Sequence, residues 1–171
     1  MPVSRTAAGT YEVRLDAESR QVLAELTTQL RNAILADRAD AAFRRLFPPA
    51  HATDEATAAE YRELVGTDLE HSKLAALETL AKTATSSELT AEETDAWVRA
   101  LNDVRLWMGT MLDVGEDDGP EELDDPPHML YQVLTWLQDV IVGALSGDED
   151  LERGDEEEDA DELREGDDGT G

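Results

Sequence analysis

Carboxylates are the most abundant groups in this sequence that could perform chemistry. The chain of 171 residues holds 41 Asp and Glu, and positions 116–125 alone contain seven acids and no base. A calcium-binding EF-hand loop requires oxygen ligands at positions 1, 3 and 5, a glycine at 6 and an acid at 12. Counting from Asp113, position 3 is Gly115 and the glycine needed at position 6 comes one residue late. The spacing therefore predicts no EF-hand, and we expect neither a bound metal nor another cofactor.

No other arrangement of side chains typical of catalysis occurs. The histidines His51, His71 and His128 are far apart, and none belongs to an HExxH pattern. The sequence has no cysteine, which excludes a thiolate nucleophile, a zinc–thiolate site and a thiol redox switch. It also lacks the GxSxG, phosphate-loop and dinucleotide-binding motifs. We therefore expect a protein that is not an enzyme and has no catalytic residues.

Arg44 and Arg45 form the densest basic spot in an acidic chain. They lie near the end of a short helix expected over 37–47, which Pro48 and Pro49 terminate. Such a helix is too short to serve as the recognition helix of a helix-turn-helix. Cations at a helix C-terminus are favoured by the helix dipole alone, so a solvated helix end is one interpretation. The other is that Arg44 and Arg45 contact a protein partner.

The segment LNDVRLWMGTML, residues 101–112, sets polar groups and a glycine among large apolar side chains. On a helical projection Leu106 points almost opposite to the main apolar face, which consists of Trp97, Leu101, Val104, Met108, Met111 and Leu112. A helix with apolar residues on both sides is expected to lie in the centre of its bundle, contacted by neighbours around most of its surface.

Asn102, Arg105 and Gly109 lie on the flank between these two faces and form a structural seam. A glycine inside a helix costs roughly 1 kcal/mol relative to alanine, which predicts the close approach of another helix over Gly109. An unpaired buried charge is costly, so Arg105 is expected to pair with Asp139 or Glu78. The three seam residues are therefore predicted to orient helix packing and not to form a site.

Local signals at the start of the chain predict a hairpin and a helix. Residues 1–15 contain an alternating stretch that indicates a half-buried strand, with a turn before it, as expected for a small β-hairpin. Asp16 is a suitable N-cap for a helix over 17–36, in which apolar residues recur at helical spacing.

Three further helical segments follow. Residues 51–86 form a helical block that we expect to break at Gly66 and Thr67. The sequence TAEE at 90–93 is a capping box that opens the helix with the seam residues. A last helix is expected over 128–145. The predicted fold class is mainly α, a single compact bundle of about five to six helices with the small N-terminal β-hairpin.

The acidic residues divide the chain into a body and a tail. The formal net charge is −27, and residues 148–171 carry fourteen acids against two arginines with almost no apolar side chain. Such a segment cannot bury enough apolar surface to fold. We therefore expect a helical domain over 1–147 with its N-terminal hairpin, followed by a disordered acidic tail over 148–171.

The charge also limits the partners and the location. A strongly negative surface repels phosphate groups, so we expect neither direct nucleic-acid binding nor membrane binding, whereas basic protein partners are favoured. The N-terminus lacks the apolar stretch of a signal peptide. The longest apolar segment, 129–145, is interrupted by Gln132, Gln138 and Asp139 and is short for a membrane span. A cytoplasmic location is expected.

Several ordered segments of the sequence resemble a known family. They are TYEVRLDAESRQVLAEL, DAAFRRLFPPAH, LNDVRLWMGTML and MLYQVLTWLQDVIVGAL, and the similarity extends over about 1–146. The chain resembles an actinobacterial domain-of-unknown-function family that includes the oxidative-stress transcriptional regulator AosR. The resemblance implies a regulatory role exerted through a protein partner such as a sigma factor. That regulator senses oxidants through a cysteine pair, which has no counterpart in this sequence.

Two functional hypotheses follow. The first is a non-enzymatic protein–protein interaction module, a transcription or stress-response regulator that acts through a partner such as a sigma factor without a cysteine redox switch; a homo-oligomer is compatible with it. The second is a small-molecule- or metal-binding helical protein, which would extend to an enzyme. Its pocket would be lined by Met and Trp side chains, namely Trp97, Trp107, Met108, Met111, Met129 and Trp136.

Overall fold

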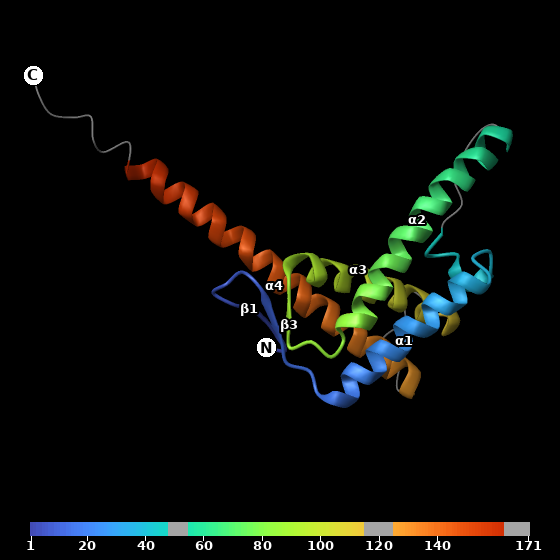
Figure 1. Ribbon diagram of the computed structural model, residues 1–171, viewed down its shortest axis with the longest axis horizontal. Helices are drawn as coiled ribbons and strands as arrows, with labels where there is room; N and C mark the ends of the chain where they lie inside the picture. The colour runs from blue at the N-terminus through green and yellow to red at the C-terminus, as the bar shows by residue number, and fades with distance from the viewer. Residues whose placement is uncertain (48–54, 115–124, 163–171) are drawn as a thin grey trace, which may run out of the picture.

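The computed structural model describes residues 1–47, 55–114 and 125–162, apart from the side chains of 55–65 and 148–162 (Figure 1). Its elements in chain order are β1 (Val3–Arg5), β2 (Tyr11–Val13), α1 (Ala17–Ala36), the 3-10 helix η1 (Ala41–Phe43), α2 (Glu55–Thr83), β3 (Glu88–Leu89), α3 (Ala91–Met111) and α4 (Pro126–Glu162). The predicted mainly α fold is confirmed, although the described residues form four α-helices where five to six were expected.

Helix α3 occupies the centre of the molecule. It contacts α1, α2, α4, η1 and β3, as its two-sided apolar pattern predicts. Trp97, Leu101 and Val104 of α3 are buried completely, together with side chains of the surrounding helices such as Leu30, Leu77, Leu134 and Ile141. The first part of α2 and the last part of α4 extend away from this core (Figure 1). Met111 at the end of α3 was assigned to the buried face but is 54% exposed.

Both predicted helix starts are confirmed. The Asp16 carboxylate accepts hydrogen bonds from the backbone N–H and the hydroxyl of Ser19, each at 2.8 Å, and so caps α1. Thr90 and Glu93 form the reciprocal capping box at the start of α3, in which each side chain accepts from the other residue's backbone N–H.

The expected break at Gly66 and Thr67 is wrong, because α2 continues through both residues. A Cβ atom on Gly66 would lie 3.4 Å from Nη1 of Arg38, which itself donates a hydrogen bond to Oε2 of Glu70 at 2.8 Å. One glycine lowers helix stability only modestly, so the helix can continue through it. The glycine also leaves room for Arg38, which binds Glu70 one turn later in the same helix.

The helix expected over 37–47 is also shorter than predicted. Only Ala41–Phe43 forms a 3-10 helix, which Asp40 caps by accepting from the N–H of Ala42. Phe43 and Leu46 anchor this segment by burying their side chains in the core. A short turn held by two apolar anchors therefore replaces the amphipathic helix.

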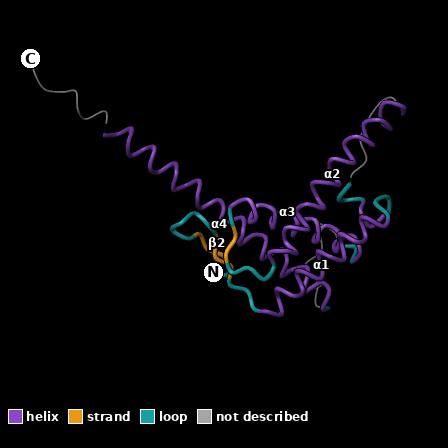
Figure 2. Tube along the Cα trace, in the orientation of Figure 1, coloured by secondary structure: helices purple, strands orange, loops and turns teal. Residues whose placement is uncertain are grey.

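The predicted N-terminal hairpin is confirmed and gains a third strand. The antiparallel order is β1-β2-β3, with Val3 opposite Val13 and Tyr11 opposite Leu89, and these four side chains are buried. Gly9 adopts φ +81° in the turn between the first two strands, a conformation that glycine adopts without strain. Strand β1 contacts α4, and the strands lie beside this helix (Figure 2).

Helix α4 passes the expected end of the body at residue 147 and continues to Glu162. Residues 163–171 and the side chains of 148–162 lie outside the described part of the chain, so the disordered acidic tail stays a prediction. No helix in the described ranges is long and apolar enough to cross a membrane.

Candidate functional site

The structure brings together two residues that the sequence placed in separate groups, Arg45 and Gly109. Nη2 of Arg45 donates a hydrogen bond to the carbonyl of Val114 at 3.1 Å, just beyond the end of α3. A Cβ atom on Gly109 would lie 3.0 Å from Nη1 of the same guanidinium. Arg44 and Arg45 both follow η1 and are exposed, and it is the Arg45 guanidinium that contacts the end of α3.

The end of α3 has the geometry that an arginine can cap. The N–H of Val114 donates to the carbonyl of Gly109 at 2.9 Å, and the N–H of Asp113 donates to the carbonyl of Thr110 at 3.3 Å. Asp113 adopts φ 54°, which completes a Schellman motif. The cation of Arg45 therefore stabilises the negative end of the helix dipole.

Helix α4 supplies the second close neighbour of Gly109. Cε2 of Tyr131 would lie 3.3 Å from a Cβ atom on this glycine, closer than ordinary van der Waals contact. Asn102 and Arg105, the other two seam residues, are half-buried on the same helix. The glycine thus provides the space in which an arginine from the segment after η1 and a tyrosine from α4 approach α3.

The expected ion pair of Arg105 with Asp139 or Glu78 is wrong. Glu78 binds Lys82 one turn later at 2.7 Å, and Asp139 is exposed on α4. Within the described residues, Nε of Arg105 is buried without a hydrogen-bond partner. The ion pair that α3 does bury is formed by a different residue.

That buried ion pair joins Asp103 of α3 to Lys73 of α2. Nζ of Lys73 lies 2.7 Å from Oδ1 of Asp103, and the two side chains are 16% and 4% exposed. Burial raises the pKa of Asp103 above its ordinary value of 3.8, although the Lys73 ammonium acts in the opposite direction. The sequence did not predict this pair. The one indication of it was the position of Asp103, an acid beside Asn102 in an otherwise apolar helix.

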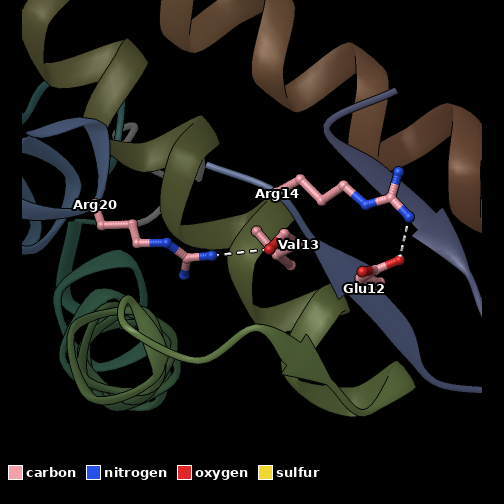
Figure 3. Close-up of polar contacts among 4 residues, drawn as sticks. All are labelled: Glu12, Val13, Arg14 and Arg20. Atoms are coloured by element: carbon pink, nitrogen blue, oxygen red, sulfur yellow. Dashed lines mark hydrogen bonds and ion pairs between the residues drawn. The ribbon is translucent and has the colours of Figure 1, made fainter. Parts of the chain in front are cut away.

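Arg20 forms a second set of polar contacts between distant segments that the sequence did not predict. Its guanidinium donates to the carbonyl of Val13 at 2.8 Å (Figure 3). It also donates to the carbonyls of Ala84 and Ser86 at 2.7 and 2.6 Å. Nε donates to the carbonyl of Leu15 at 3.0 Å. Arg20 therefore ties α1 to β2 and to the turn before β3.

The other arginine beside this strand has a different environment. Arg14 pairs with Glu12 at 2.6 Å on the surface of the sheet, away from Arg20 (Figure 3). The Arg14 side chain is 65% exposed, so the pair contributes little to stability.

The six residues proposed to line a small-molecule pocket do not all lie together, although Met129 and Trp136 share one surface depression. Trp97, Trp107 and Met108 are buried in the core, whereas Met111, Met129 and Trp136 are exposed. Among the histidines, His71 is exposed, His128 contacts the carboxylate of Asp125, and His51 lies outside the described residues. The described ranges contain no group of three His, Asp or Glu side chains that could hold a metal ion, and the acidic stretch 116–125 lies almost entirely outside them.

The main surface feature is an apolar stripe on α4. Met129, Val133 and Trp136 are 54%, 53% and 53% exposed, and their spacing of four and three residues places them on one helix face. Nearly every turn of 129–145 is apolar in the sequence. The sequence therefore did not indicate which face the fold would leave uncovered.

Two residues of the stripe, Val133 and Trp136, line a groove between the start of α1 and α4, which we name the α1/α4 groove; Met129 lies outside its lining. Val22 and Leu23 line it from α1, Leu15 lines it from the segment before α1, and the α4 side consists of Leu130, Val133, Leu134, Trp136 and Leu137. Its volume is about 350 Å³, and Asp16, Glu18 and Ser19 form its polar edge. The groove combines an apolar floor with an acidic rim, which is an arrangement suited to binding a polypeptide.

The fold and this surface define a small helical protein with an N-terminal three-stranded sheet and an open groove. Residues 1–145 match the family described as "Domain of unknown function (DUF2017)", and the chain belongs to this family.

Two of its relatives carry the name "Oxidative stress regulator AosR", one from Mycobacterium tuberculosis and one from Mycobacterium bovis. Each is 38% identical to the chain over 76 residues, which are 42% of this chain and 34% of the relative. The chain thus matches about a third of the length of these curated relatives. No solved structure matches the chain significantly.

Proposed function

We propose that this protein is a non-enzymatic regulator that acts by binding a protein partner, for example a sigma factor or another transcription component. The observation that carries the proposal is the exposed apolar stripe of Met129, Val133 and Trp136 on α4. Exposed apolar residues that adjoin one another on one helix face are typical of interaction surfaces. The two relatives named as oxidative stress regulators support a regulatory role in the stress response.

The proposal includes the compartment and the mode of regulation. The chain would act in the cytoplasm, where transcription takes place, and its acidic surface favours a basic partner over nucleic acid. Regulation would not use a cysteine switch, because the sequence contains no cysteine. The acidic residues of 148–171 would compete with nucleic acid for the basic surface of the partner.

The experiment is affinity purification of the tagged full chain from the cells that produce it, followed by mass spectrometry. We expect a stoichiometric complex with a component of the transcription machinery, reconstituted afterwards from the two purified proteins. Recovery of the chain alone, or of a small-molecule ligand in place of a protein, would contradict the proposal. Deletion of 148–171 should weaken the reconstituted complex at low salt more than at high salt.

A further inference from the structure

We infer that the α1/α4 groove is the docking surface for a basic amphipathic helix of the protein partner. This inference rests on the proposed function and assigns to it a surface and the chemistry of the occupant. An amphipathic helix that places its apolar face into a groove is a recurrent mode of peptide recognition.

The apolar part of the groove has the dimensions of such a helix. Leu130, Val133 and Leu137 line the groove over two turns of α4, which corresponds to about 10 Å along the helix axis. Val22 of α1 and Leu15, which precedes α1, provide the opposite wall. About two turns of a partner helix therefore find apolar side chains on both sides. Tryptophan is enriched among the residues that dominate binding energies, and Trp136 lies half-exposed on this wall.

The charge of the rim identifies the occupant as basic. Asp16 and Glu18 line the groove, and none of its described lining residues is Lys or Arg. Hydrogen bonds from Ser19 lower the pKa of Asp16, which keeps its carboxylate ionised. Asp139 is exposed on α4, one turn beyond Trp136. Lysines or arginines on the flanks of an incoming helix would pair with these carboxylates.

The same charge argues against a second copy of this chain as the occupant. Two chains of net charge −27 would bring their acidic rims together, which is unfavourable at moderate ionic strength. A basic amphipathic helix, in contrast, can bury its apolar side chains on the groove floor and pair its cations with the acidic rim.

The test uses the full chain and a fluorescein-labelled peptide of 18 residues made of leucine and lysine, with the leucines at helical spacing. Fluorescence anisotropy should show saturable binding of one peptide per chain that weakens several-fold between 50 and 300 mM salt, because ion pairs with the rim are screened. The variants Val133→Lys and Trp136→Ala should each weaken binding at least tenfold. Both side chains are half-exposed, so circular dichroism and the melting temperature should stay close to those of the unmodified chain.

Leu35→Lys is the matched control. Leu35 is an apolar residue whose exposed fraction, 53%, equals that of Val133, and it lies at the opposite end of α1 from the groove. Its replacement should leave the affinity for the peptide unchanged. Equal weakening by Leu35→Lys and Val133→Lys, or equal binding of a peptide with the same composition but scrambled leucine positions, would show that binding depends on charge alone and would overturn the inference.

Two further outcomes separate this inference from the proposed function. If a transcription component forms a complex that Val133→Lys and Trp136→Ala leave intact, the groove is not the docking surface and this inference is overturned. The proposed regulatory function would then still stand. If the peptide binds the groove as described but the cells yield no protein partner, the proposed function fails and the peptide specificity of the groove stands. A chain dimer in sedimentation that Val133→Lys dissociates would identify a second copy as the occupant and overturn the inference.

Discussion

Nζ of Lys73 lies 2.7 Å from Oδ1 of Asp103, between α2 and α3. The chain has few basic residues, 14 in all against 41 acids, and one of them is placed inside the helix interface. The pair fixes how α2 lies along the central helix, since neither charge can leave the interface without losing its partner.

Replacement of Lys73 by methionine should lower the free energy of unfolding by about 3 kcal/mol, because it leaves the Asp103 carboxylate buried without a counter-charge. The matched control is Lys82→Met on the same helix. Lys82 pairs with Glu78 at the surface, where the two side chains are 71% and 49% exposed. Its loss should cost less than about 0.5 kcal/mol. Equal losses in chemical denaturation would show that Lys73 and Asp103 do not form a buried pair.

Protonation of Asp103 should make a measurable contribution to the pH dependence of the free energy of unfolding. Burial raises the pKa of Asp103 above 3.8, so the folded chain binds this proton more tightly than the unfolded chain does. Its contribution to stability is therefore largest below pH 3.8 and declines as the pH rises toward the folded pKa. We expect the difference in free energy of unfolding between the unmodified chain and Asp103→Asn to fall with increasing pH over this window.

Asp16 provides the control of opposite sign. Hydrogen bonds from the backbone and hydroxyl of Ser19 lower the pKa of Asp16 below 3.8, so its contribution is present above that pH and is lost as the pH falls through the folded pKa. The corresponding difference for Asp16→Asn should rise with pH. Denaturation curves between pH 2.5 and 6 measure both differences, and slopes of the same sign would refute the assignment.

The two glycines Gly109 and Gly143 should respond differently to substitution. A Cβ atom on Gly143 meets nothing within 4 Å, so Gly143→Ala should stabilise α4 by about 1 kcal/mol. Gly109→Ala should bring no such gain, because its Cβ would approach Arg45 and Tyr131, and Gly109→Leu should destabilise the fold by about 2 kcal/mol. Thermal denaturation of the three variants tests this, and stabilisation by Gly109→Ala as large as that by Gly143→Ala would show that α3 is not closely approached there.

Arg20 should contribute far more to stability than Arg14. Arg20→Met removes four hydrogen bonds to backbone carbonyls and leaves acceptors of three segments unsatisfied, which we expect to cost about 3 kcal/mol. Arg14→Met removes one exposed ion pair and should cost less than about 0.5 kcal/mol. Urea denaturation compares the two variants directly. Similar midpoints would mean that Arg20 does not hold the sheet to α1.

The features predicted correctly depend on neighbours in the sequence. The N-cap Asp16, the capping box of Thr90 and Glu93 and the hairpin around Gly9 are each specified by residues within a few positions of one another. Strand β3 was missed because two residues carry no recognisable alternation, and its pairing with β2 joins positions almost eighty residues apart.

The polar contacts could not be predicted for the same reason. Lys73 and Asp103 are thirty residues apart, and the sequence offers many acids as alternative partners for each cation. The exposed side of α4 is decided by which face α3 and β1 cover, because 129–145 is apolar on nearly all sides. The candidate groove therefore follows from the assembly of distant elements.

The contact of β1 with α4 affects how the chain is made. Ribosomes release β1 first among the described elements and α4 last, so the hairpin forms long before the helix that covers it has been synthesised. Until then the buried side chains of Val3 and Val13 face solvent or chaperones. A chain that stalls before α4 therefore leaves the apolar side chains of its hairpin without the helix that covers them.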